Sequence, residues 1–212
     1  MIEDRLMLND DKTELMLIGT RQQLQKFNLK DITVGDTIVE VKSVARNLGS
    51  WFDRNLDMSF HRSKQCALAF YHLHNISRIR WFLSTDTSKA LVHAFVTSRV
   101  GYCNSLLYGL PASHLNKVQR VLNAASRLVC RAPRYCRITP VMYKLHWLPV
   151  MQRISFEILL FVLKAIHAIG FYLLTYVLPR EIRSITDLGI FKCHLRTHLF
   201  KEAFYYFHHD NY

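Results

Sequence analysis

The chain has 212 residues and a mass of 25.0 kDa, which fits one domain or slightly more, and its content of 50% hydrophobic and 12% aromatic residues excludes a disordered tail. Lysine and arginine number 28 against 16 aspartates and glutamates, for a net charge of +12. A mean hydropathy of +0.03, with charges at regular intervals, argues against an integral membrane protein.

Short strands are predicted first. Leu15–Ile18 is a brief apolar run, and Ile32–Val34 and Ile38–Val41 flank a turn at Gly35 and Asp36. Two β-rich runs separated by a two-residue turn are typical of a hairpin. We therefore expect residues 1–54 to hold a small β region.

From Leu56 onward the apolar residues take up helical spacing. The first two segments with this spacing contain Cys66, Ala69, Phe70, Leu73 and Ile76, and then Leu91, Ala94 and Phe95. The expected class is thus α+β, predominantly α: a short N-terminal hairpin followed by a bundle of helices, which we divide at 55–135 and 136–212.

The clearest predicted helix is Ser113–Arg131, with Ser113 as its N-cap and Pro133 ending it. Its apolar residues fall within one arc at 100° per residue. They are Leu115, Val118, Val121, Leu122, Ala125, Leu128 and Val129. We expect this arc to face the core.

A basic stripe lies on the opposite face of this helix and continues into the loop after it. Its members are Lys117, Arg120, Arg127, Arg131, Arg134 and Arg137. Residues 87–156 hold ten basic side chains and no acidic one, and we call this stretch the acid-free block. An ordinary solvated face mixes signs for i,i+4 pairing, so this one favours a polyanionic partner, nucleic acid first and an anionic membrane surface second.

Two more helices are predicted at Val150–Ile169 and Leu188–Tyr206. The apolar stretch Ile154–Leu178 includes Glu157 and Lys164, so we do not expect it to span a membrane. Neither a membrane nor a small-molecule substrate is an expected partner.

Signatures of catalysis and metal binding are missing. The sequence has no glycine-rich phosphate loop, HExxH pair or GxSxG elbow. Cys193 with His194 and His198 is the best zinc candidate, but it lacks further ligands at suitable spacing. Five scattered cysteines imply no disulfide framework and favour a reducing, intracellular compartment, nuclear or cytoplasmic.

Six segments of the chain form a recognisable set. They are Leu8–Glu14, Val44–Gly49, Thr97–Pro111, Val118–Leu128, Leu145–Ile154 and Phe191–Phe200. In the same order, they resemble segments of the reverse transcriptases of non-LTR (LINE-type, jockey-like) retrotransposons. Leu8–Glu14 is similar to the family's Leu-Asn-x-x-Lys-Thr-Glu motif, which follows the catalytic turn of the palm, and Thr97–Pro111 resembles its Ser-Arg-x-Asp-Tyr-Cys-Asn-Ser-Leu-Leu-Tyr-Gly block. The resemblance covers nearly the whole chain.

The resemblance implies the end of the palm at 1–54, a thumb-like region at 55–135 and a helical extension at 136–212 of an RNA-directed DNA polymerase. Lys12 matches the family's palm lysine, and Leu48 with Gly49 match the turn that grips the primer. The family's catalytic aspartates, which hold Mg²⁺, precede the Leu8–Glu14 motif, so we expect no catalysis and no cofactor here, with Lys12 idle.

Two departures from the family suit a decayed copy. Gly101 stands where the family has Asp, and family sequence is missing between His167 and Pro179. The prediction is a non-catalytic remnant that binds template-primer nucleic acid without sequence preference. The alternatives are a small helical protein-interaction module and a chain that does not fold stably; the oligomeric state is left open.

Overall fold

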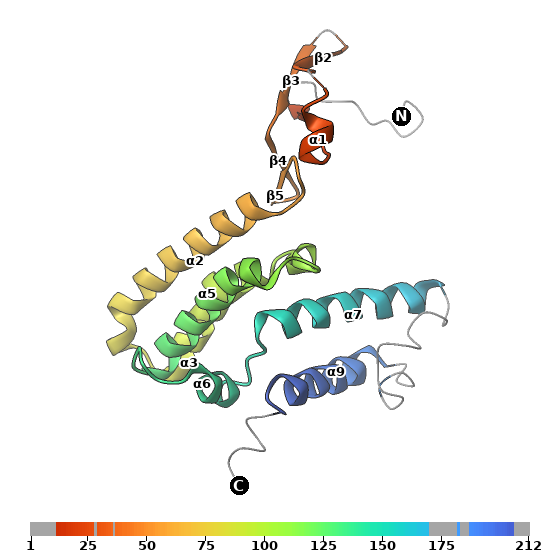
Figure 1. The fold of residues 1–212 in the computed structure, drawn as a ribbon. Coiled ribbons are helices and arrows are strands. Elements are labelled where there is room, and N and C mark those ends of the chain that lie inside the picture. The colour runs from red at the N-terminus through yellow and green to blue at the C-terminus, as the bar shows by residue number, and fades with distance from the viewer. Residues whose placement is uncertain (1–11, 28, 36, 170–181, 183–186, 206–212) are drawn as a thin grey trace. The chain divides into compact units, whose positions relative to one another are not determined.

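The computed structural model describes residues 12–27, 29–35, 37–169, 182 and 187–205 (Figure 1). The chain divides into two compact units, Met1–Lys64 and Gln65–Tyr212. Over the described residues, all strands lie in the first unit, and most of the helical residues lie in the second. The predicted class, α+β and predominantly α, is confirmed.

A three-stranded sheet opens the first unit, in the order β1-β3-β2. β2 (Asp31–Val34) runs antiparallel to β3 (Thr37–Lys42), as the hairpin prediction required, and β1 (Leu15–Met16) adds to β3 in parallel. Val34 lies opposite Thr37, so two residues make the turn, and Gly35 supplies a φ of 60° that other residues rarely adopt.

A second hairpin, which the apolar pattern did not reveal, joins β4 (Val44–Asn47) to β5 (Ser50–Asp53). Its two turn residues, Leu48 and Gly49, have φ angles of 46° and 86°. Positive φ at both central residues is the geometry that suits the twist of a two-residue hairpin. Leu48 is exposed at the tip of this turn.

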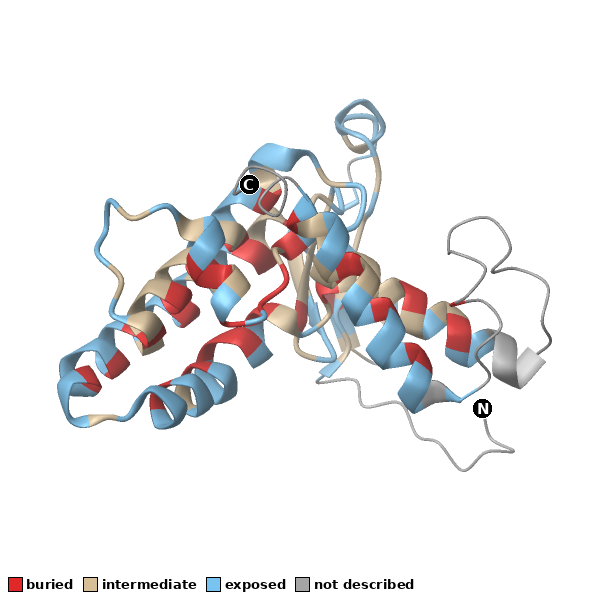
Figure 2. Ribbon diagram, turned by 90° about the horizontal axis from the view of Figure 1, so that it is seen from below, coloured by how far each residue is buried: buried red, intermediate tan, exposed pale blue. Residues whose placement is uncertain are grey.

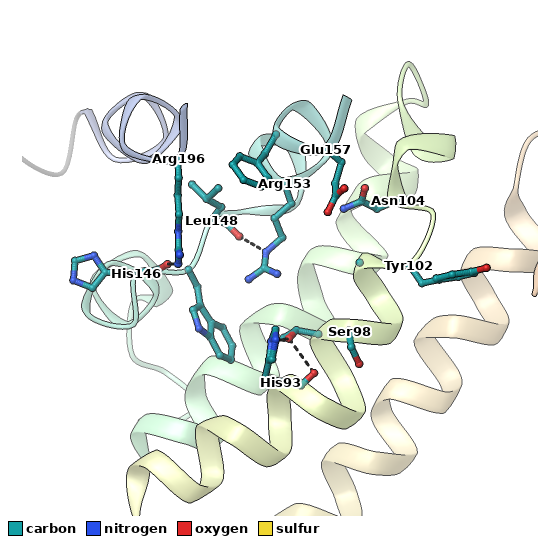
Figure 3. A pocket seen from close by; sticks show the side chains of 13 residues that line it. His93, Ser98, Tyr102, Asn104, His146, Leu148, Arg153, Glu157 and Arg196 are labelled. Atoms are coloured by element: carbon teal, nitrogen blue, oxygen red, sulfur yellow. Dashed lines mark hydrogen bonds between the residues drawn. The ribbon is translucent and has the colours of Figure 1, made fainter. Parts of the chain in front are cut away.

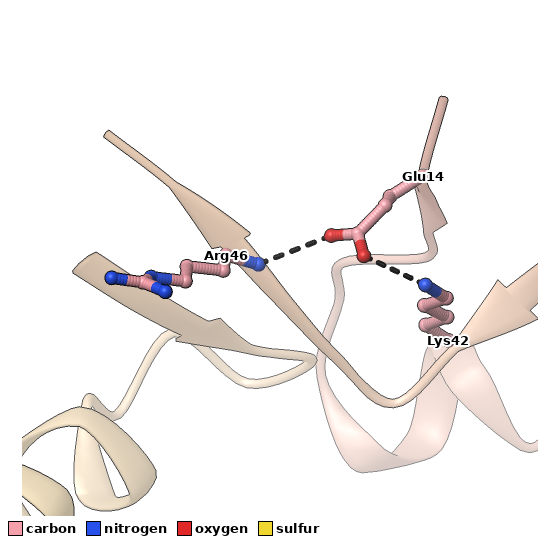
Figure 4. A network of polar contacts seen from close by, with 3 residues as sticks. All are labelled: Glu14, Lys42 and Arg46. Atoms are coloured by element: carbon pink, nitrogen blue, oxygen red, sulfur yellow. Dashed lines mark hydrogen bonds and ion pairs between the residues drawn. The ribbon is translucent and has the colours of Figure 1, made fainter. Parts of the chain in front are cut away.

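Glu14 connects three segments of the first unit (Figure 4). One carboxylate oxygen accepts a hydrogen bond from Nζ of Lys42 at 2.7 Å, and the other accepts the main-chain N–H of Arg46 at 3.2 Å. These bonds hold the pKa of Glu14 below its usual value. Glu14 therefore ties the start of β1 to β3 and β4. Nearby, α1 (Arg21–Leu24) is a single turn with a capping box made by Thr20 and Gln23.

Helices make up the rest of the described chain. α2 (Ser59–Ile79) begins in the first unit and continues into the second. The following elements are the 3₁₀ turn η2 (Arg80–Phe82), α3 (Thr85–Val92), the π-helical turn η3 (His93–Thr97), α4 (Ser98–Gly101), the 3₁₀ turn η4 (Asn104–Leu107), α5 (Ala112–Cys130), α6 (Ile138–Lys144), α7 (Val150–Ile169) and α9 (Leu188–Ala203). The predicted helices at 113–131 and 150–169 are present, and the one at 188–206 is described to Ala203.

Both ends of α5 form in a different way from the one predicted. Ser113 is wrong as the N-cap, because it is the second residue of the helix. The N-cap is Pro111, which has no side-chain acceptor, and its main-chain carbonyl accepts the first N–H bonds of the helix. At the other end Arg131, with a φ of 51°, stops the helix before Pro133. The N–H of Ala132 bonds the Arg127 carbonyl at 3.0 Å, a Schellman closure.

The apolar arc of α5 does face the core, since six of its seven predicted members are buried. Buried and exposed positions alternate along the helices in the same way in Figure 2. Leu128 is only half-buried, and Ser126 takes a fully buried place because its hydroxyl donates to the carbonyl of Leu122 at 2.5 Å. α7 and α9 enclose a separate apolar cluster: Leu148, Leu159, Leu163, Ile182, Phe191, Leu195 and Leu199. Within the described ranges, no helix is long and apolar enough to cross a membrane. The segment 170–181, which includes most of the departure at His167–Pro179, lies outside them.

Candidate nucleic-acid interface

The predicted basic stripe separates into two groups. Lys117 and Arg120 on α5, and Arg134 and Arg137 in the loop between α5 and α6, are exposed. We call these four side chains the basic surface. Over the described residues, none of the four forms an ion pair. Four cations without acidic neighbours produce a positive potential that attracts phosphate groups.

Arg127 belongs to the second group and positions the loop. Its Nη2 donates to the main-chain carbonyl of Cys136 at 3.2 Å, and its Nε is buried without a hydrogen-bond partner among the described residues. Cys136 lies between Arg134 and Arg137 in the chain, so this bond folds the loop back beside α5. Arg127 thus serves the basic surface by holding the loop, not by facing solvent.

Arg131 is likewise engaged within the fold. Its Nη2 donates to the carbonyls of Arg80 and Trp81, both at 3.3 Å, and its guanidinium lies 5.0 Å from the centre of the Trp81 ring. Such a cation–π contact adds to the hydrogen bonds. Both contacts fasten the C-terminal end of α5 to η2.

Arg80, in η2, also bonds the C-terminal end of α5. It is 6% exposed and donates to three carbonyls: Nε to Leu128 at 2.9 Å, Nη1 to Leu83 at 2.8 Å and Nη2 to Val129 at 2.7 Å. Burial, and then the nearby charge of Arg131, lower its pKa. Two of these acceptors are end carbonyls of α5, where the helix dipole favours a cation.

Main-chain carbonyls are the recurrent partners of arginine in the second unit. Besides Arg80, Arg127 and Arg131, the side chain of Arg153 donates to the Leu148 carbonyl at 2.7 Å, and that of Arg196 to the His146 carbonyl at 3.1 Å. Part of the positive charge of the acid-free block is therefore stabilised by the dipoles of main-chain carbonyls. Among the contacts of the described residues, the four cations of the basic surface have no such carbonyl partner.

Sequence analysis missed the aromatic residues that accompany the basic surface. Tyr135, between Arg134 and Arg137, is 91% exposed, and Trp81 and Phe82 are also exposed beside the end of α5. Aromatic rings interleaved with cations are typical of surfaces that stack bases and neutralise phosphates. The order Arg-Tyr-Cys-Arg at residues 134–137 is the signal that could have revealed Tyr135.

The remaining predicted residues belong to the first unit. Lys12 is exposed at the start of the described chain, and Leu48 and Gly49 form the β4–β5 turn. These residues and the basic surface belong to different units of the chain.

A metal centre does not fit the residues described. Within those ranges, no three histidine, cysteine, aspartate or glutamate side chains gather closely enough to hold an ion, and Cys193, the zinc candidate, is an exposed thiol on α9.

Comparison with known proteins adds no relative. No protein-family model, curated protein sequence or solved structure matches the chain. The chemistry of the surface itself is what remains to support a function.

Proposed function

We propose that this chain binds the sugar-phosphate backbone of nucleic acid without sequence preference, as the thumb-like, non-catalytic part of a retrotransposon RNA-directed DNA polymerase. The observation that carries the proposal is the basic surface, four exposed cations on one helix and its adjoining loop with no carboxylate in the surrounding sequence. The six segments that resemble the family support the same reading.

Phosphate contacts position a protein on nucleic acid and do not read its sequence. None of the four cations forms an ion pair among the described residues, so none has to break one before it binds a phosphate. Tyr135 supplies a stacking surface that any base can use. The expected ligand is a template-primer, either an RNA–DNA hybrid or a duplex with a single-stranded extension.

A salt titration tests the proposal. Binding of a fluorescent RNA–DNA hybrid to the full chain is followed by anisotropy at several salt concentrations. Neutralising four phosphates predicts a slope of about −3.6 for log affinity against log salt, from about −0.9 per contact. The double variant Arg120→Gln/Arg134→Gln should flatten this slope by about 1.8 on every sequence tested.

The matched control is Arg21→Gln/Lys26→Gln, which removes two exposed cations from the first unit and should leave the slope unchanged. A wild-type slope near zero, or an equal loss in the control, overturns the proposal. The second candidate is a helical module that binds an acidic protein, which the exposed Trp81 and Phe82 favour. That candidate predicts no measurable affinity for the hybrid at physiological salt.

A further inference from the structure

A cavity of about 530 Å³ lies within the second unit, bounded by η3, α4 and η4 on one side and by α7 and α9 on the other. This volume falls in the range of pockets that bind small organic ligands. None of the four residues of the basic surface lines it. The cavity is therefore separate from the basic surface and independent of the proposed function.

Arg153 is the principal polar group of this cavity (Figure 3). Its Nε donates to the carbonyl of Leu148 at 2.7 Å, which fixes the side chain, and the rest of the guanidinium is directed into the cavity. The guanidinium lies 5.9 Å from the ring centre of Trp147, a buried residue of the cavity wall. Burial, and then the charge of Arg196, lower the pKa of Arg153 to about 10.

Arg196 reaches the same cavity from α9. Its Nη2 donates to the carbonyl of His146 at 3.1 Å, which leaves its other donors available. Neither guanidinium forms an ion pair with a described carboxylate, although Glu157 also lines the cavity. Two guanidinium groups against one carboxylate give the cavity a net charge of +1 with its histidines neutral. An anion would relieve the mutual repulsion of Arg153 and Arg196.

Asn104 provides a second, independent sign of a ligand. It is 6% exposed, and its Oδ1 is buried with no hydrogen-bond partner among the described residues. Buried polar atoms without a partner are uncommon in native proteins, and Asn104 is one of the residues that line the cavity. An oxygen acceptor in this position calls for a hydroxyl or amino donor on the ligand. Beside it, the π-helical turn η3 contributes His93 and Thr97 to the wall, and such turns recur at functional sites.

We propose that this cavity binds a phosphorylated nucleoside. Its phosphate would pair with Arg153 and Arg196, its ribose hydroxyls or amino group would donate to Asn104 and Glu157, and its base would pack against the aromatic wall. Guanidinium groups match phosphate oxygens in geometry as well as charge. Phe156 and Trp147 provide the aromatic surface. The ligand can come from a free nucleotide or from the 5′-phosphorylated end of a strand, since both present the same chemistry.

Isothermal titration of the full chain with adenosine 5′-monophosphate tests the proposal, with adenosine, inorganic phosphate and leucine as comparison ligands. We expect the nucleotide to bind at least tenfold more tightly than any of the three. Arg196→Gln, at an exposed position that should not disturb folding, is expected to weaken nucleotide binding about 10- to 100-fold, and Arg153→Gln by at least as much. Lys192→Gln, an exposed cation on the same helix that does not line the cavity, is the matched control and should have no effect.

A 5′-phosphorylated trinucleotide and its 5′-hydroxyl counterpart distinguish the two sources. Binding of the phosphorylated strand as tightly as the mononucleotide supports a strand end, and binding of the mononucleotide alone supports a free nucleotide. The proposal is overturned if adenosine or leucine binds as tightly as the nucleotide, or if Arg196→Gln behaves like Lys192→Gln. Arg120→Gln/Arg134→Gln should leave nucleotide binding intact, so failure here and failure of hybrid binding are separate results.

Discussion

Replacing Arg80 by methionine should destabilise the second unit strongly. The substitution keeps an unbranched side chain as far as the position of Nε and removes all three hydrogen bonds to the carbonyls of Leu83, Leu128 and Val129. A hydrogen bond from a charged group contributes about 1.5–3 kcal/mol when its loss leaves a buried partner unsatisfied. The Leu128 carbonyl keeps one other donor, the N–H of Arg131 at 3.4 Å, so two acceptors lose the most.

One opposing contribution reduces this loss. A buried guanidinium is desolvated, as its lowered pKa indicates, and methionine removes that cost. The net expected decrease in the free energy of unfolding is about 3 kcal/mol. For a unit of this size that corresponds to a fall in Tm of about 6–12 °C. Arg80→Lys should fall between wild type and Arg80→Met, because an ammonium group keeps the charge without the planar fork.

Urea and thermal unfolding of the full chain, followed by circular dichroism at 222 nm, measures these differences. Arg78→Met is the matched control, since Arg78 is exposed two residues earlier on α2. Its unfolding should stay within about 0.5 kcal/mol of wild type. If Arg80→Met and Arg78→Met unfold at the same urea concentration, the three hydrogen bonds of Arg80 do no more than offset the cost of desolvating its guanidinium. The expected stabilisation of the contact between α5 and η2 would then be refuted.

Two further predictions concern other buried polar groups. His61 is 3% exposed, its Nδ1 accepts the main-chain N–H of Trp51 at 3.2 Å, and burial lowers its pKa, so the native state binds fewer protons than the unfolded state. The stability that neutral His61 contributes should be complete above the ordinary histidine pKa of 6.5 and should be lost as pH falls through the lower native pKa. Urea unfolding between about pH 7 and 4 should therefore depend less on pH in His61→Asn than in wild type. An identical pH dependence in the two proteins would contradict this. The side-chain oxygen of Gln119 accepts a hydrogen bond from the main-chain N–H of Val150, at the start of α7, at 2.9 Å. Gln119→Leu should therefore lower the free energy of unfolding by about 1–2 kcal/mol. Gln119→Glu keeps the acceptor and should lower it by less. Exposed Asn116→Leu on the same helix is the control in urea unfolding, and a loss equal to that of Gln119→Leu would refute the bond's contribution.

Periodicity predicted the elements that bury one continuous side. The apolar arc of α5 and the bounds of α7 follow from spacing alone, because burial of one helix face imposes it. The β4–β5 hairpin was missed for the opposite reason. Its strands include Arg46, Asn47 and Asp53 and carry little apolar alternation, and its turn places Leu48 at positive φ in place of the Asn-Gly pair that marks such turns.

The candidate sites show a different limit. The sequence identified six basic residues, but it could not separate Arg127 and Arg131 from the four of the basic surface, because their partners are carbonyls that every residue possesses. Which carbonyl faces which arginine is decided only by tertiary packing. The cavity was missed for the same reason: Asn104, Arg153 and Arg196 come from three elements far apart in the chain, and no motif joins them.

The arginine–carbonyl contacts also determine how this protein responds to its surroundings. A salt bridge fails in acid because its carboxylate takes up a proton, but a peptide carbonyl does not titrate in that range and arginine stays protonated. The contacts of Arg80, Arg127, Arg131 and Arg153 with main-chain carbonyls therefore do not depend on the charge of a carboxylate. Acid can weaken the first unit through His61, while the end of α5 keeps its contacts until the helix itself unfolds.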